Sequence, residues 1–320
     1  MPERGRGEET SDPTPDGGVV GGVSAASPGD STAEATETGT ETATDTERVS
    51  VPLPRPEIVL RIARREARLT TRRGWAVALT VVFAAFGLLL AMFSGSSVAP
   101  TGYEPVVASY VELATYLVPL AALALGHGAI VGAAERGRLG VVLTLPVSRA
   151  EAAIGLFAGR AVVLAASVVL GFGVPGLLLL REFGLAGWPT FAWFLLATVA
   201  VAVALLGLGV AISAVAPSST VALAGALLVW AWFALVHDLL ALGVLAALDG
   251  AGAFVAVAVA ANPVSTYRLL ALAPTDAGGA GLAAALDGSG LSVGLLVAVL
   301  LGWVAVAVGV AAVALRSKRI

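Results

Sequence analysis

Residues 190–216 have the sequence TFAWFLLATVAVAVALLGLGVAISAVA, which contains no charged side chain. A helix that crosses a bilayer needs about 20 consecutive, largely apolar residues, and this stretch exceeds that length. Five other windows are also long and largely apolar, so the sequence predicts an all-α polytopic membrane protein with six transmembrane helices. The predicted spans are residues 75–93, 106–131, 152–180, 190–216, 220–242 and 291–315. A shorter apolar run, residues 252–261, predicts a re-entrant or surface helix.

The composition agrees with a membrane protein and excludes several other classes. Of the 320 residues, 58% are hydrophobic and 13% are charged. Soluble domains are closer to half apolar and a quarter charged, which excludes an ordinary soluble enzyme. The chain contains no cysteine. This excludes disulfide scaffolds, thiolate metal sites and cysteine catalysis.

Two parts of the chain differ sharply in charge. Residues 1–50 carry eleven acidic residues against three arginines and show no apolar periodicity. Such a segment buries too little apolar surface to offset its ordering entropy, so we expect residues 1–52 to form a disordered acidic tail. The tail has no apolar core of the kind that a secretory signal requires. Residues 53–320 are predicted to form the membrane domain.

A basic amphipathic segment, residues 56–72, precedes the first span. Ile58, Ile62 and Leu69 share one face at helical spacing. Five of the other positions carry arginine, at Arg61, Arg64, Arg65, Arg68 and Arg72. Two interpretations stay open. The segment is either an interfacial helix whose arginines bind anionic lipid, or a basic flank that only fixes the orientation of the first span.

The basic residues also predict the orientation of the spans. With both termini in the cytoplasm, fourteen basic residues flank the inner side, and only Arg181 and Arg268 lie outside. Positive charge accumulates on cytoplasmic loops, so we expect a multi-pass protein of the cell membrane with both termini inside. The largest external segment would then be residues 249–290.

The loop between the second and third spans has a distinct pattern, GAAERGRLGVVLTLPVSRAEAAIG (residues 132–155). An apolar stripe at helical spacing follows the charged start, and a proline ends it. Ser148 and Glu151 have the spacing of a capping box, which predicts a helix start. The loop is either a rigid docking element for a soluble partner or a plain basic loop with a good cap. Its candidate residues are Glu135, Arg136, Gly137, Leu139, Leu143, Pro146 and Arg149.

No catalytic motif is evident. The sequence has no GxxxxGK[ST] phosphate loop, no HExxH and no GxSxG, so we predict neither an enzyme nor a metal site. Ion-coupled transporters usually carry buried ionisable residues near mid-bilayer. The candidates here are Glu112, His127 and Asp238, and neither Glu112 nor Asp238 is placed convincingly there. An ion-coupled transporter therefore remains the less favoured alternative.

The segment AIVGAAERGRLGVVLTLPVSR (Ala129–Arg149) resembles the signature of the ABC-2 type permeases. The resemblance covers about residues 57–319 and implies a type V exporter-like fold with an N-terminal interfacial helix. It also implies that the inner loop is the coupling helix that contacts an ATPase. Ala133 and Ala134 replace the usual acidic pair, Arg138 stands where Thr or Ser is common, and Leu156 where Lys is common.

The same resemblance implies the partners. We expect a homodimer of this chain bound to two copies of a cytoplasmic ABC ATPase, which would hold the ATP and magnesium, while this chain binds no cofactor and no nucleic acid. The string NPVSTYRLLAL (residues 262–272) is similar to the permeases that serve copper-site maturation of nitrous oxide reductase. The alternative is an ABC-2 permease that exports a lipid, a drug or another small molecule. The residues of the external contact or family motif are Asp238, Asn262, Pro263, Tyr267 and Arg268.

Overall fold

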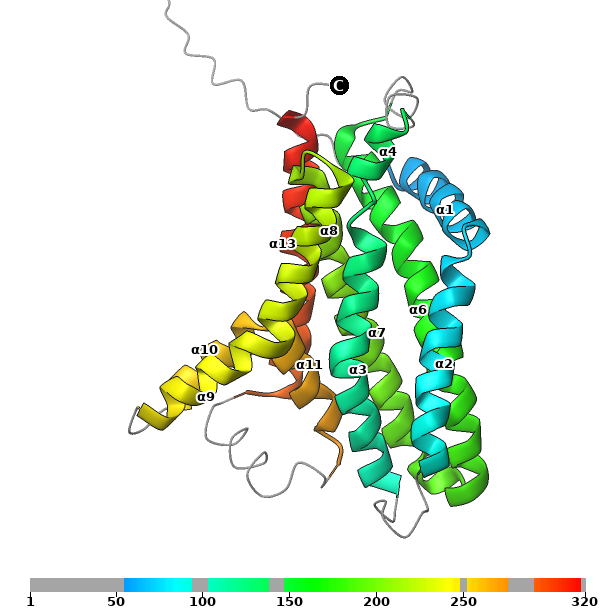
Figure 1. The fold of residues 1–320 in the computed structure, drawn as a ribbon, viewed down its shortest axis with the longest axis vertical. Coiled ribbons are helices and arrows are strands. Elements are labelled where there is room, and N and C mark those ends of the chain that lie inside the picture. Colours follow the sequence, from blue (N-terminus) through cyan, green and yellow to red (C-terminus); the bar gives the residue numbers. More distant parts are fainter. Residues whose placement is uncertain (1–54, 94–102, 138–146, 248–251, 276–290, 318–320) are drawn as a thin grey trace, which may run out of the picture. The chain divides into compact units, whose positions relative to one another are not determined.

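The computed structural model describes residues 55–93, 103–137, 147–247, 252–275 and 291–317. Within these ranges the chain is helical and forms no β-strand (Figure 1). The elements are α1 (Pro56–Arg72), α2 (Trp75–Phe93), α3 (Tyr103–Gly126), α4 (Val131–Glu135), α6 (Arg149–Phe183), the 3-10 helix η1 (Leu185–Gly187), α7 (Trp188–Val215), α8 (Ser219–Ala231), the π-helix η2 (Trp232–Val236), α9 (His237–Ala247), α10 (Gly252–Ala261), α11 (Pro263–Leu272) and α13 (Val293–Ser317).

Six helical segments in the described residues are long and apolar enough to cross a membrane. This confirms the predicted all-α polytopic fold. Some of their ends differ from the sequence prediction. The third segment begins at Arg149, after the predicted Ser148 cap, but it continues past Leu180 to Phe183, where Gly184 at φ 71° ends it. The six segments are Trp75–Phe93, Tyr103–Glu135, Arg149–Phe183, Leu185–Val215, Ser219–Leu240 and Val293–Leu315.

The second, third and fourth of these segments form the interior of the bundle. Between 50% and 61% of their most apolar windows are buried, against 17–22% for the other three. A cluster of aromatic rings packs among these three segments and α2: Phe83, Tyr110, Phe172, Phe191 and Phe194. The exposed sides of α2, α8 and α13 are apolar, as expected for surfaces that face lipid or another subunit.

Glycines allow two helix pairs, α3 with α7 and α1 with α6, to approach closely. A Cβ atom built on Gly126 of α3 would lie 2.8 Å from the Cα atom of Gly209 in α7, so the two backbones touch. On α6, a Cβ atom at Gly155 would lie 2.6 Å from Ile62, and one at Gly159 would lie 2.5 Å from the carbonyl oxygen of Ala63. The side of α1 that carries Ile62, Ala63 and Glu66 therefore packs against the start of α6.

The fifth segment is interrupted by the π-helix η2, which lies between α8 and α9. Figure 1 shows α8 running along the bundle and α9 bending away from it beyond this point. An inserted residue of this kind disturbs the regular backbone hydrogen bonds, and such bulges are a known cause of kinks. The short apolar run at residues 252–261 is the helix α10, which ends at Asn262.

Candidate functional site

Helix α4 is attached to the bundle by side-chain hydrogen bonds at both ends. The hydroxyl of Ser213 in α7 accepts hydrogen bonds from the amides of Ile130 and Val131, at 2.9 and 3.1 Å. At the other end of α4, the carboxylate of Glu135 accepts the amide of Ser219 at 2.7 Å and also the Ser219 hydroxyl. Ser219 is the first residue of α8, so a carboxylate here interacts favourably with that helix's positive end. Glu135 thus joins α4 to α8.

Beyond Glu135, two of the predicted coupling residues lie in the described part of the loop. The guanidinium of Arg136 folds back over Gly132, where a Cβ atom would lie 3.0 Å from its Nη2. Gly137 has φ 67°, a left-handed conformation that favours glycine, and turns the chain out of α4. Leu139, Leu143 and Pro146 lie outside the described residues.

At the start of α6, the capping box predicted from the sequence is present. The Ser148 hydroxyl accepts the Glu151 amide at 3.1 Å, and the Glu151 carboxylate accepts the Ser148 amide at 2.7 Å. The same carboxylate also accepts the Arg55 amide at 2.8 Å, which ties it to the residue preceding α1. Arg149 donates from Nη1 to the carbonyl oxygen of Leu315 in α13.

A buried ion pair connects α1 to α6 at the same end of the bundle. Arg160 Nε lies 2.9 Å from Glu66 Oε1, and the two side chains are only 7% and 9% exposed. Arg160 also donates to the carbonyl oxygens of Leu125 and Gly128, at the C-terminal end of α3. Those carbonyls at the helix end have no intrahelical donor, and Arg160 supplies one. This single guanidinium therefore joins α1, α3 and α6.

We did not predict Glu66 and Arg160 as site residues. The available signal was a carboxylate at Glu66 on the side of α1 that also carries Ile62 and Thr70, and an arginine just inside an apolar span. Their separation of 94 residues hides the pairing in the sequence.

The contacts at this end give the connection between α4 and α6 two fixed attachment points. Its first end is bonded to α7 and α8 through Ser213 and Glu135. Its second end is bonded to the Arg55 amide and to α13. A force applied to this connection is therefore passed directly to several spans. The arrangement is suited to mechanical transmission.

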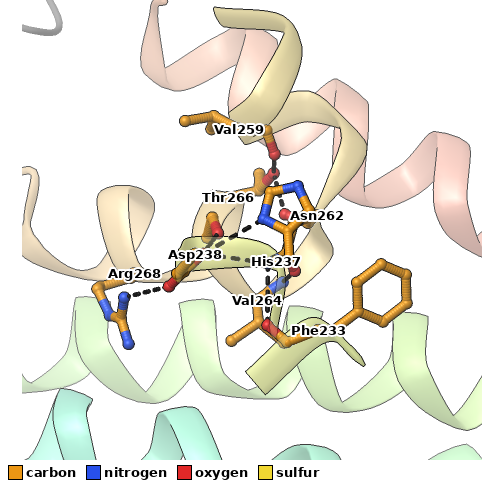
Figure 2. A network of polar contacts seen from close by, with 9 residues as sticks. Phe233, His237, Asp238, Val259, Asn262, Val264, Thr266 and Arg268 are labelled. Atoms are coloured by element: carbon orange, nitrogen blue, oxygen red, sulfur yellow. Dashed lines mark hydrogen bonds and ion pairs between the residues drawn. The ribbon is translucent and has the colours of Figure 1, made fainter. Parts of the chain in front are cut away.

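A second polar cluster joins α9 and α11, well away from α4 (Figures 1 and 2). Asp238 Oδ1 accepts the Ser265 hydroxyl at 2.7 Å, and Oδ2 accepts Arg268 Nη1 at 2.8 Å. Arg268 Nε lies 3.3 Å from Glu112 Oε1, but among the described residues it makes no hydrogen bond. His237 Nδ1 lies 3.3 Å from Asp238 Oδ1. Asp238 is therefore the main partner of Arg268.

Asn262 links this cluster to the π-helix. Its Nδ2 donates to the carbonyl oxygen of Phe233 in η2 at 3.0 Å, and its Oδ1 accepts the amide of Val264 at 2.8 Å (Figure 2). The second bond caps α11, in which Pro263 occupies the first position. Asn262 thus links the π-helix η2 to the start of α11.

The motif residues Asn262, Pro263 and Tyr267 are buried rather than presented to a partner. The Tyr267 hydroxyl lies 3.1 Å from the Thr198 hydroxyl and holds α11 against α7. Only Asp238 and Arg268 keep partial exposure, at 35% and 26% of their side chains. Among the described residues, no group of three His, Asp or Glu side chains is placed to hold a metal ion.

Replacing Asp238 by asparagine should lower the stability of the chain by about 1–3 kcal/mol, since a hydrogen bond to a charged group contributes about 1.5–3 kcal/mol. The variant retains an oxygen for Ser265 but removes the charge that Arg268 faces. Thermal unfolding in detergent measures the effect. Glu112→Gln is the matched control. It should lose less stability, because the Glu112 side chain is 54% exposed. Equal losses would contradict the assignment of Asp238 as the main partner.

Comparison with known proteins agrees with the inner-loop signature. The profile of the ABC-2 family transporter protein matches residues 60–319. A protein of Pseudomonas aeruginosa PAO1 named "Probable ABC transporter permease protein NosY" is 33% identical over 235 residues, which cover 70% of this chain and 85% of that protein. A protein of the same name from Stutzerimonas stutzeri is 31% identical over 260 residues, or 78% of this chain and 94% of that protein. The chain therefore belongs to the ABC-2 family of transporter permeases.

Proposed function

We propose that this chain is a NosY-like permease that couples a cytoplasmic ATPase to an extracytoplasmic process in copper-site maturation of nitrous oxide reductase. An ABC-2 permease is the transmembrane subunit of its transporter, and ATP hydrolysis takes place in a separate subunit. The similarity to two NosY proteins and the NPVSTYRL string at residues 262–269 support the finer assignment. In this proposal two copies of the chain bind two ATPase subunits, which hold the ATP and magnesium.

The observation that carries the proposal is the double attachment of the connection between Glu135 and Ser148. An ATPase that pushes on residues 133–151 would move α7 and α8 through Ser213 and Glu135. It would move α6 and α13 through the capping box and Arg149. A coupling element needs rigid supports of this kind at both of its ends.

The orientation in this proposal places α4 on the cytoplasmic side of the cell membrane, with both termini inside. The arginines of α1, together with Arg136, Arg149 and Arg160, lie on elements at that end of the bundle. Among the basic residues that the structure describes, Arg181 and Arg268 belong to the opposite side, which agrees with the usual excess of cytoplasmic positive charge. The segment 249–290 would then be external and would contact a NosD-like protein.

The exposed apolar helices support the homodimer. Leu228 of α8, Leu239 of α9 and Leu301 of α13 are between 63% and 72% exposed. Part of this surface would be covered by the second copy of the chain, and lipid would cover the rest.

The chain is poorly suited to carry copper(I) itself. Copper(I) prefers thiolate and thioether ligands, and the sequence has no cysteine and only two methionines, Met1 and Met92. We infer that the permease transmits the motion of the ATPase to an external protein, or moves an apolar or sulfur-containing species. Tight copper(I) binding by the purified permease dimer alone would contradict this inference.

Replacing Glu135 by alanine should uncouple the ATPase while the spans stay folded. The substitution cuts the link between α4 and α8 that the Glu135 carboxylate forms. In the reconstituted complex we expect the permease-dependent part of ATP hydrolysis to fall severalfold.

Ser218→Ala is the matched control for this experiment. It removes the side-chain cap that Ser218 gives to the Val221 amide at the same end of α8, but leaves the contact with α4 intact. Coupling should survive in this variant. Loss of coupling in both variants, or in neither, would contradict the assigned role of Glu135.

Adjacent genes for an ABC ATPase and nitrous oxide reductase would distinguish the proposed NosY-like function of the chain from the export of another substrate.

A further inference from the structure

We propose that the exposed face of α1 is a binding site for the phosphate headgroups of anionic phospholipids. Five arginines are exposed on this helix, and together with Leu69 they line a groove of about 420 Å³. They recur at intervals of three or four residues, apart from the adjacent pair Arg64 and Arg65, so they form one stripe. The five are Arg61, Arg64, Arg65, Arg68 and Arg72.

The opposite face of α1 packs against α6, and this contact fixes the direction in which the arginine stripe points. Ala63, Glu66 and Thr70 are buried, and Glu66 forms the ion pair with Arg160 of α6. Gly155 and Gly159 let α6 approach Ile62 and Ala63 closely. The helix is thereby held in one rotation, and its arginines point away from the bundle. Among the described residues, none of the five forms an ion pair or a hydrogen bond through its side chain.

Lipid is the source of phosphate that the surroundings favour. Two residues, Arg73 and Gly74, separate α1 from the apolar span α2, so the stripe begins next to the hydrocarbon boundary. Leu60 on α1 is 49% exposed, and Val77 and Val81 near the start of α2 are 64% and 59% exposed. Arginine beside exposed aliphatic surface matches a ligand with an anionic headgroup and acyl chains. A free phosphate ion would contact only the arginines and not the exposed aliphatic surface.

Arginine is well suited to this role, because its guanidinium donates two parallel hydrogen bonds to phosphate oxygens and remains charged at every physiological pH. Clusters of four or more basic residues on an interfacial helix bind anionic lipid more strongly with each added charge. This binding does not depend on the ATPase or on the transported species. Its success or failure is therefore separate from that of the proposed function.

The test uses the full chain, purified in a neutral detergent and titrated with short-chain phosphatidylglycerol. A ligand that binds only the folded state raises the thermal unfolding midpoint, from which its affinity is obtained. We expect phosphatidylglycerol to bind and phosphatidylcholine to have little effect. The variant R61Q/R64Q/R68Q should bind phosphatidylglycerol about tenfold or more weakly. The variant R61K/R64K/R68K should retain most of the affinity.

The charge-matched control is R4Q/R6Q/R48Q, which removes the same number of positive charges from the acidic segment and should bind like the wild type. Equal affinities for the two lipids, unchanged affinity in R61Q/R64Q/R68Q, or an equal shift with inorganic phosphate would overturn the proposal. If R61Q/R64Q/R68Q does not fold, the salt dependence of phosphatidylglycerol binding to the wild type tests the proposal. Affinity for phosphatidylglycerol that falls as sodium chloride is raised supports the proposal, and affinity that does not change overturns it.

Discussion

Replacing Glu66 by leucine should lower the free energy of unfolding by about 3–5 kcal/mol, because it leaves the buried Arg160 guanidinium without its counter-ion. The Arg160 side chain is only 7% exposed, so water cannot readily replace the lost carboxylate. Its bonds to the carbonyl oxygens of Leu125 and Gly128 hold the end of α3 to the same point. Denaturant unfolding in mixed micelles measures the loss.

Glu57→Leu is the matched control, since it makes the same substitution at an exposed position of the same helix. It should leave the stability almost unchanged. The double variant E66L/R160M should recover part of the loss, because two buried charges are removed together. Recovery will be incomplete, since the carbonyls of Leu125 and Gly128 lose their donor. A loss with Glu66→Leu no larger than that of the control would contradict the structural role of the pair.

Replacing Gly126 by alanine should cost about 3 kcal/mol, at the upper end of the usual range for an overpacked core. The added methyl group would meet backbone atoms of Gly209 at 2.8 and 2.9 Å. Backbone cannot rotate out of the way as a side chain can, so α3 and α7 must separate. Because α3 leads into α4, the separation should also displace the start of the connection to α6. Thermal unfolding and permease-dependent ATP hydrolysis measure the two effects.

Gly128→Ala tests whether the effect comes from the close contact rather than from the loss of a glycine near the end of α3. A Cβ atom at Gly128 would have no described neighbour within 4 Å. This variant should unfold at nearly the wild-type temperature and keep its coupling. If the two alanine variants behaved alike, the contact between α3 and α7 would not be the sensitive feature.

The centres of the spans were predictable because each is a long, largely apolar run, whereas their ends depend on local chemistry. The sequence prediction ended the third span at Leu180, since Arg181 and Glu182 follow it. The helix instead continues through both charges to Phe183 and stops where Gly184 adopts a positive φ. Charge marks where the hydrocarbon ends, but a helix ends where its backbone is capped.

The candidate site was predictable only where its contacts are local. Ser148 and Glu151 are three residues apart, and their capping box was evident from that spacing. Glu135 and Ser219 are 84 residues apart, and their contact depends on how α7 and α8 fold back beside α4. The π-helix η2 was also hidden, because its residues are as apolar as those of the helix around them.

In the proposed function, residues 133–151 face the cytoplasm and contact an ATPase. The natural chain lacks cysteine, so a single Leu143→Cys substitution provides a clean probe. A membrane-impermeant maleimide should label it in inside-out vesicles only, and adding the ATPase should protect it. Ser289→Cys, in the external segment, should label in right-side-out vesicles only. Labelling of Leu143→Cys from the outside, or labelling that the ATPase does not reduce, would contradict the claim.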